Sequence, residues 1–173
     1  CQCRRQRQMC IRDSYKEMLD LPYRKNRLVK PEKLTQYSMG LFVLFFGSKK
    51  KYPSVAHHTI WMAERYKDLL KDIFENKILT EDFSLYIHRP TATDETFAPS
   101  GKDSFYVLCP VPNLQASINW EIEGPLLKDK IVKALSETIM PNLDKNIEAD
   151  FWMTPKDFKN DYRSMPVSYT HLT

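Results

Sequence analysis

Residues 82–114, DFSLYIHRPTATDETFAPSGKDSFYVLCPVPNL, decide the fold that the sequence predicts. This stretch holds two apolar runs rich in β-forming residues, Leu85–Ile87 and Phe105–Cys109, separated by a polar loop at Thr91–Lys102. Pro110 follows the second run, and it predicts the end of that strand because proline cannot donate a hydrogen bond to a neighbouring strand. We therefore expect two buried strands joined by a loop longer than a tight hairpin requires, which is typical of functional loops.

The remaining elements alternate between strand and helix patterns along the chain. Four further segments have strand patterns: 38–47, 55–62, 118–122 and 147–153. Four segments have helix patterns: 15–21, 64–76, 124–140 and 154–162. The expected fold class is α+β, or α/β-like, with a mixed β-sheet and flanking helices.

The segment 64–76 has the clearest helical periodicity. We expect its apolar stripe to face the core and Asp72 to face water. The stripe consists of Tyr66, Leu69, Leu70, Ile73 and Phe74. In the helix 154–162, Thr154 is a plausible N-cap and Pro155 suits the first helical position.

Both ends of the chain have the pattern of translated adaptor DNA. Arg4–Ser14 reads RRQRQMCIRDS, and Pro166–Leu172 reads PVSYTHL. Codons can be chosen so that Met9–Ser14 and Pro166–His171 come from opposite strands of one DNA segment, which resembles the transposon end used in sequencing-library adaptors. Codons for Arg4–Gln8 also match the adaptor. We therefore expect residues 1–14 and 166–173 to be of adaptor origin and 15–165 to be the protein portion.

Excluding those ends changes the charge and cysteine arguments. The chain has 26 Lys and Arg against 22 Asp and Glu; residues 1–14 carry four Arg and one Asp, so 15–165 has 22 basic and 21 acidic residues, a net charge of +1. This balance gives no support to nucleic-acid binding. Three of the four cysteines fall within 1–14. Cys109 is then predicted to be a small core residue, without a disulfide or zinc pattern around it.

The residues by themselves show no catalytic motif. The sequence contains no G-x-G-x-x-G, P-loop, G-x-S-x-G or H-E-x-x-H pattern. His57 and His58 are adjacent in a predicted strand, so we expect their side chains on opposite faces and predict no metal site. No run is long enough to span a bilayer, and the N-terminal segment lacks the apolar region of a signal peptide.

Six blocks carry a resemblance to a known family: SMGLFVLFFG, KYPSVAHHTI, ILTEDFSLYIHRPTATD, APSGKDSFYVLCPVPNL, INWEIEGP and TPKDFKNDY. Their order and spacing are similar to those of the bacterial-type phytoene desaturases, the FAD-dependent carotenoid desaturases, over nearly all of 15–165. The resemblance implies a two-domain flavoprotein, with this segment as the substrate domain and its junction to the FAD domain. The Gly-rich dinucleotide fingerprint and the Gly-rich flavin segment of that family are missing here.

The resemblance also implies an activity for the parent protein. FAD would accept hydrogens removed from an extended apolar polyene in carotenoid biosynthesis. A substrate that lives in lipid implies a cytoplasmic protein with peripheral membrane association. The present segment alone is expected to be inactive and not to bind FAD. The alternatives left open are a C30 carotenoid desaturase, a carotenoid isomerase and a non-enzymatic α+β interaction domain.

Six residues of the central stretch are expected to bind substrate: Arg89, Thr91, Thr93, Asp94, Phe105 and Tyr106. On the resemblance, their loop would face the flavin end of a substrate tunnel, and the apolar runs 41–46 and 105–109 would help to wall it. The competing interpretation is a structured surface loop in which Asp94 and the threonine hydroxyls bind backbone amides. No catalytic, cofactor-binding or metal-binding residue is assigned.

Overall fold

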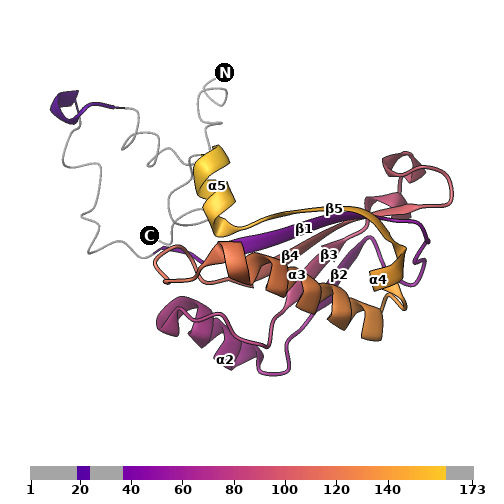
Figure 1. Cartoon of the computed structure of the whole chain (residues 1–173), viewed down its shortest axis with the longest axis horizontal. Helices are drawn as coiled ribbons and strands as arrows, with labels where there is room; N and C mark the ends of the chain where they lie inside the picture. Colours follow the sequence, from indigo (N-terminus) through magenta and orange to yellow (C-terminus); the bar gives the residue numbers. More distant parts are fainter. Residues whose placement is uncertain (1–18, 24–36, 163–173) are drawn as a thin grey trace, which may run out of the picture.

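The computed structural model describes residues 19–23 and 37–162. These residues contain one five-stranded sheet with the strand order β2-β3-β4-β1-β5 (Figure 1). The strands are β1 (Gly40–Ser48), β2 (His58–Trp61), β3 (Leu85–His88), β4 (Asp103–Val111) and β5 (Ile147–Met153). The helices are α2 (Tyr66–Lys71), α3 (Trp120–Glu137), α4 (Leu143–Asn146) and α5 (Pro155–Tyr162). Shorter turns are η2 (Leu21–Tyr23), the π-helical η5 (Asp72–Asn76), η6 (Pro90–Ala92) and η7 (Glu95–Phe97).

All four strand pairings in the described residues are antiparallel. A sheet with separate helices agrees with the predicted α+β class, but the expectation of a mixed sheet is wrong. The reason lies in the connections. β3 and β4 are adjacent in the sheet and joined by a loop that holds only the short 3-10 turns η6 and η7, whereas a parallel pair needs a crossover connection, usually an α-helix.

One face of the sheet packs against α3, which runs along it in Figure 1. The contacting residues of α3 are spaced at helical intervals, and those of β1 alternate along the strand. They are Leu127, Ile131 and Leu135 on the helix, and Phe42, Leu44 and Phe46 on the strand. Burying one side chain of this size contributes about 2 kcal/mol, so this layer is the main hydrophobic core.

The helix α3 begins at Trp120, so the strand predicted over 118–122 is wrong. Asn119 is the N-cap, and its side chain accepts a hydrogen bond from the Glu121 N–H at 3.2 Å. Acidic residues occupy the first turn, where the helix macrodipole stabilises negative charge. Pro125 lies inside this helix instead of starting it. Capping and the burial of Trp120 therefore outweigh the short alternating pattern.

The helix predicted over 64–76 is present as α2 followed by the π-helical η5. Leu69 and Ile73 are buried, as predicted. Asp72 was expected to face water, but it is 8% exposed and accepts a hydrogen bond from Asn76 Nδ2 at 2.8 Å. A π-turn holds more residues than an α-turn, which rotates the following side chains away from the predicted stripe. Two members of that stripe are exposed, Tyr66 and Phe74.

The strand β4 continues through Pro110 to Val111, beyond its predicted end. Pro110 is tolerated because β3 pairs only with residues 106–108 of β4, which leaves that side of β4 unpaired beyond Leu108. The strand predicted at 55–62 is shorter than expected, and β2 begins only at His58. Cys109 is buried and free of a disulfide, as predicted, and burial raises the pKa of its thiol to about 12.

The last strand and helix match their predictions closely. β5 has the predicted bounds, and α5 begins with Pro155 in its first position. The Asp157 carboxylate accepts hydrogen bonds from the Thr154 N–H at 2.8 Å and the Thr154 hydroxyl at 2.7 Å. The first of these contacts satisfies one of the backbone N–H groups that a helix start leaves unpaired.

Some predictions concern residues outside the described ranges. The adaptor origin of 1–14 and 166–173 lies there and stays a prediction. Most of the helix predicted at 15–21 lies there too, but its described end is not α-helical: residues 19 and 20 belong to no helix, and Leu21 begins the 3-10 turn η2. Among the described helices, none combines the length and the apolar character needed to cross a membrane.

Candidate functional site

The side of the sheet opposite α3, here called the open face, presents aromatic and aliphatic side chains to solvent. It consists of Phe45, Ile60, Tyr86, Tyr106, Leu108 and Phe151. Phe45, Phe151 and Ile60 are 38%, 58% and 69% exposed. Single exposed apolar residues are ordinary on a protein surface, whereas a contiguous group across five strands indicates a binding surface.

Ring contacts order the side chains of the open face. The Phe45 ring centroid lies 5.2 Å from that of Tyr106 and 5.9 Å from that of Phe151. Tyr86 meets Tyr106 edge to face at 6.2 Å. Such pairs contribute about 0.5–1.5 kcal/mol each beyond area burial, so they hold the rings in fixed orientations. The helix α5 contacts β1 and β5 at one end of the sheet.

A buried polar network fixes the loop between β3 and β4. The Asp103 carboxylate accepts hydrogen bonds from the Tyr52 N–H at 2.7 Å, Arg89 Nε at 3.1 Å and the Thr91 hydroxyl at 2.6 Å. Arg89 Nη1 also donates to the Val55 carbonyl at 2.9 Å. The side chains of Asp103 and Arg89 are 0% and 9% exposed, so each charge depends on its partner.

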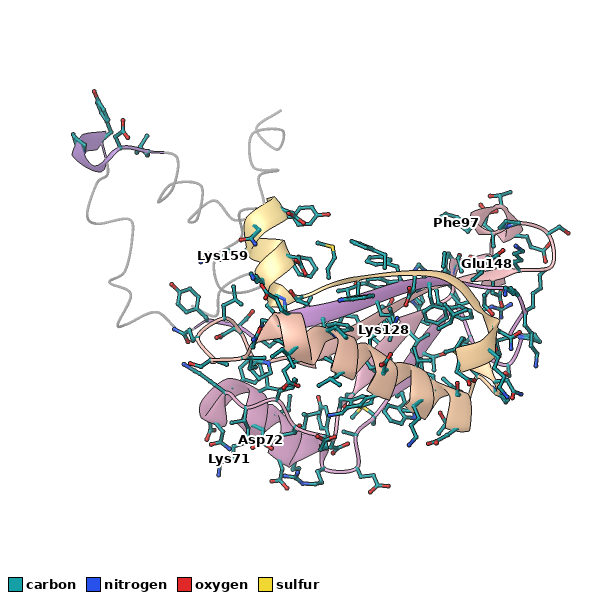
Figure 2. The ribbon with its side chains drawn as sticks, viewed as in Figure 1. Lys71, Asp72, Phe97, Lys128, Glu148 and Lys159 are labelled. Carbon is teal, nitrogen blue, oxygen red and sulfur yellow. The ribbon has the colours of Figure 1, made fainter. Side chains whose placement is uncertain are left out.

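The rest of this loop is exposed and held by local contacts. Asp94 accepts hydrogen bonds from the Thr96 N–H at 2.9 Å and the Thr96 hydroxyl at 2.7 Å, which lower the pKa of the Asp94 carboxyl. The Thr93 hydroxyl donates to the Pro90 carbonyl at 3.2 Å. Phe97 projects from the loop and is 61% exposed (Figure 2). These contacts match the interpretation of a structured surface loop.

The six predicted substrate-binding residues lie in three different environments. Arg89 and Thr91 meet at the Asp103 carboxylate in the buried network. Thr93 and Asp94 lie on the exposed part of the loop. Phe105 stacks on Phe46 in the core beneath α3, and Tyr106 lies on the open face. The structure therefore brings only the first pair together, and their assignment to substrate stays a prediction.

Three histidines form a cluster at the β2–β3 edge, which corrects the expected geometry of His57 and His58. Their rings stack with centroids 4.4 Å apart, because His57 precedes β2 and does not follow strand alternation. His88 pairs with His58 across the strands, and its Nε2 lies 2.8 Å from Nε2 of His57. Partial burial, and then repulsion from the other two rings, lower the pKa of His88.

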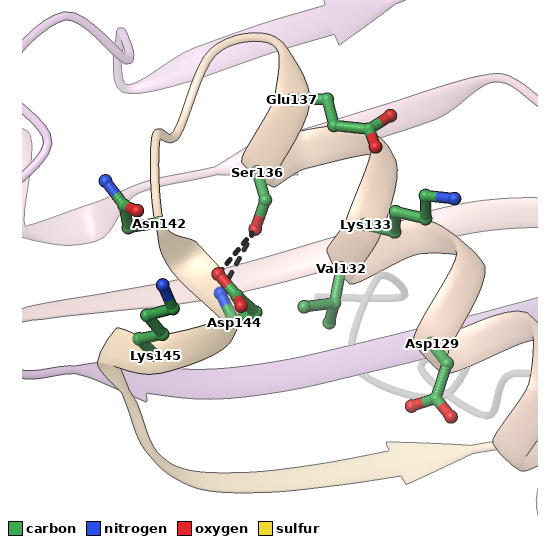
Figure 3. A pocket seen from close by; sticks show the side chains of 8 residues that line it. All are labelled: Asp129, Val132, Lys133, Ser136, Glu137, Asn142, Asp144 and Lys145. Carbon is green, nitrogen blue, oxygen red and sulfur yellow. Dashed lines mark hydrogen bonds between the residues drawn. The ribbon is translucent and has the colours of Figure 1, made fainter.

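A separate pocket lies between α3 and α4 (Figure 3). Its volume is about 510 Å³, and its walls mix Asp, Glu and Lys side chains. The Ser136 hydroxyl accepts a hydrogen bond from the Asp144 N–H at 3.1 Å, which anchors α4 to the end of α3. Ion pairs elsewhere are similarly structural, such as that of Lys128 on α3 with Asp150 on β5. We assign this pocket no function, because its charges are mixed and it lies away from the open face.

Comparison with known proteins identifies relatives over most of the chain. It is 41% identical over 152 residues to a lycopene-forming phytoene desaturase from Paracoccus sp., covering 87% of this chain and 30% of the relative. It is 44% identical over 134 residues to a neurosporene-forming phytoene desaturase from Rhodobacter capsulatus, covering 75% of this chain and 26% of the relative. A 4,4'-diapophytoene desaturase from Methylomonas sp. is 33% identical over 147 residues, covering 82% of this chain and 29% of that protein.

These relatives are all carotenoid desaturases by name. Within that class, the resemblance to the bacterial-type phytoene desaturases is confirmed. The chain spans 25–30% of the length of the curated relatives that it matches. No protein-family model matches it.

Sequence reasoning missed three features of the site. The open face gave no signal in the sequence, because Phe105–Cys109 is apolar throughout, and only the structure shows Tyr106 and Leu108 alternating with buried residues of β4. The histidine cluster depends on the β2–β3 register. This register places His88 beside His58, although the two residues are far apart in the sequence. Asp103 gave no signal, because a single aspartate beside a glycine-containing loop is ordinary in a turn.

Proposed function

We propose that the chain is the substrate-binding part of an FAD-dependent phytoene desaturase. The observation that carries this proposal is the 41–44% identity to curated phytoene desaturases over most of the chain. The parent protein would remove hydrogens from an extended polyene hydrocarbon in carotenoid biosynthesis. FAD would accept those hydrogens, because the redox chemistry in such enzymes is that of the cofactor.

The open face supports a role in holding the hydrocarbon. A polyene offers no hydrogen-bonding groups, so it is bound by apolar area and by shape. Phe45, Phe151 and Tyr106 form a nearly continuous ring-lined strip across three strands. Their mutual stacking limits rotamer freedom, which lowers the entropy lost when a ligand is bound. Six residues were predicted from the sequence to bind substrate. Of these, Tyr106 is the one that lies on the open face and would contact the hydrocarbon directly.

The buried network would act indirectly. Arg89 and Thr91 bind Asp103, and this contact fixes the loop at the end of β3. Tyr106 and Leu108 follow Asp103 on β4, so the network positions the beginning of the strand that contributes to the open face. We propose that these residues position the strand, while Thr93 and Asp94 shape the exposed loop.

The proposal for the parent protein also includes FAD as cofactor and peripheral association with the membrane. The chain has no G-x-G-x-x-G pattern, whose backbone N–H groups would bind a dinucleotide phosphate. We therefore propose that this chain by itself does not hold FAD. A hydrocarbon substrate partitions into lipid, and peripheral association of a cytoplasmic enzyme with the membrane would give it access.

The relatives favour phytoene over the shorter C30 substrate. Identity to the 4,4'-diapophytoene desaturase is 33%, against 36–44% for the phytoene desaturases. The C30 desaturase is the second candidate. Supplying the full-length enzyme with either hydrocarbon distinguishes them, and faster conversion of the C30 substrate would favour that candidate.

The test of the open face uses two substitutions of equal exposure in the full-length enzyme. Phe151 on β5 and Ile122 on α3 are both 58% exposed. Phe151→Lys places a charge where the hydrocarbon would lie, and loss of apolar contact should lower product formation by about tenfold or more. Ile122→Lys adds the same charge on the helix side and should leave product formation unchanged.

Product is measured by absorbance of the extracted carotenoid, with flavin content and melting temperature as checks on folding. Equal activity of the two variants, with normal folding of both, would remove the open face from the proposal. Loss of activity in both would mean that the added charge, and not its place, was responsible.

A further inference from the structure

The histidine cluster is built on paired backbone, so the fold fixes the positions from which the three side chains extend. His58 and His88 are direct partners in the antiparallel register of β2 and β3. The His57 carbonyl accepts a hydrogen bond from the Arg89 N–H at 2.9 Å, which ties the residue before β2 to the end of β3. Arg89 is in turn held by the buried network. Three imidazoles from two segments therefore lie stacked side by side at the sheet edge, with interplanar angles of 19°, 29° and 11°.

The ligand nitrogens of these residues all lie within 4.8 Å of one another. Around Zn²⁺, imidazole nitrogens at 2.0–2.1 Å in tetrahedral geometry are separated by about 3.3 Å. Nε2 of His57 and Nε2 of His88 are already 2.8 Å apart, so a metal would replace the hydrogen bond between them. His58 is exposed, so its ring has room to turn toward the other two.

A tyrosine hydroxyl selects the nitrogen of His58 that would bind. Nδ1 of His58 lies 2.6 Å from the Tyr86 hydroxyl oxygen. When that nitrogen carries a proton and donates to the hydroxyl oxygen, Nε2 is left as the ligand atom. Hydrogen bonding of the second ring nitrogen is the usual way in which proteins orient histidine ligands.

We propose that His57, His58 and His88 form a binding site for a divalent transition-metal ion, Zn²⁺ foremost. Neutral imidazole suits Zn²⁺, Co²⁺, Ni²⁺ and Cu²⁺, while Mg²⁺ and Ca²⁺ favour oxygen ligands, which this cluster does not supply. Three protein ligands leave a fourth tetrahedral position for water or another small ligand. The proposal does not rest on the proposed desaturase function, because it uses only the cluster geometry.

The experiment titrates the full chain with Zn²⁺ by calorimetry and with Co²⁺ by absorbance. Thiolates would compete, so Cys1, Cys3 and Cys10 are first changed to serine, and this triple variant is the reference protein. In it, Co²⁺ should bind one per chain and give ligand-field bands without the sulfur charge-transfer band. His171, the fourth histidine in the sequence, provides the matched control through His171→Gln.

Metal affinity should fall by more than about tenfold in each of the variants His57→Gln, His58→Gln and His88→Gln. It should fall by about tenfold in Tyr86→Phe, as expected for a residue that orients a ligand. His171→Gln should bind like the reference. Zn²⁺ should also raise the melting temperature of the reference, because it binds only the folded cluster. Because His58 is exposed, His58→Gln provides a test even if His88→Gln fails to fold. Absence of one-to-one binding in the reference, or equal binding by the folded cluster variants, would overturn the proposal.

Discussion

Asp103 is the residue on which the central loop depends. It receives three hydrogen bonds, from a backbone N–H, a guanidinium and a hydroxyl. A buried carboxylate and a buried guanidinium each lose hydration, and only their contact offsets that loss. The Arg89–Asp103 pair therefore adds little to the net free energy of unfolding, and its main role is to fix where the loop attaches to the sheet.

Removing the charge of Asp103 should destabilise the fold because it leaves Arg89 buried without a counter-ion. We expect Asp103→Asn to lower the free energy of unfolding by about 3 kcal/mol, measured by chemical denaturation. Asp94→Asn is the matched control in the same loop, and it should have no measurable effect, because Asp94 is exposed and an amide oxygen can still accept the Thr96 hydrogen bonds. Equal stability of the two variants would contradict this role for Asp103.

Among the elements, α3 carries the core face and its start is set by capping. Leu127, Ile131 and Leu135 enter the core from one side of this helix. Asn119 satisfies a free N–H in the first turn, and the acidic residues of that turn suit the positive end of the helix dipole. The helix thus begins upstream of Pro125. The preference of proline for the first turn of a helix had predicted a start at Gly124–Pro125.

The cap of α3 can be tested by removing its side chain. Asn119→Ala should lower the free energy of unfolding by about 1 kcal/mol, because the Glu121 N–H loses its acceptor. Ser117→Ala is a control two residues upstream at an exposed position and should leave stability unchanged. If segment 118–122 were a strand, as its alternation predicts, Asn119→Ala would instead be neutral or stabilising.

At the scale of the whole molecule, the two faces of the sheet differ in kind. α3 covers one face (Figure 1) and packs aliphatic side chains against it. On the other face the rings of Phe45 and Phe151 are exposed. An open apolar sheet face favours association, since burying it against any apolar surface removes area from water. The same property that would bind a hydrocarbon therefore makes the chain prone to self-association.

We expect the purified chain to associate as its concentration rises, with a weight-average mass that increases in sedimentation equilibrium. Phe151→Lys should reduce this increase, because a charge on the open face opposes its burial. Ile122→Lys, equally exposed but on α3, should associate like the unmodified chain. A constant monomer mass for the unmodified chain would show that the open face does not associate with itself.

Local patterns in the sequence were sufficient for most elements. The unbroken apolar run of β1, the stripe within 64–76 and the Thr154–Pro155 start of α5 all led to correct element types. In each case one feature, periodicity or capping chemistry, determines the local conformation. The strand predicted at 118–122 failed because its alternation was short, and a cap with an acidic first turn favoured the helix.

By itself, the sequence determined the α+β class, the resemblance to bacterial-type phytoene desaturases and the presence of the strands β1 and β4. Only the tertiary structure decided which side chains share a surface. Strand order and register bring Phe45, Tyr106 and Phe151 into one strip, and they bring His88 to His57 and His58. The physical reason is that periodicity records the alternation of side chains within one strand, whereas cross-strand neighbours depend on long-range pairing that no local pattern encodes.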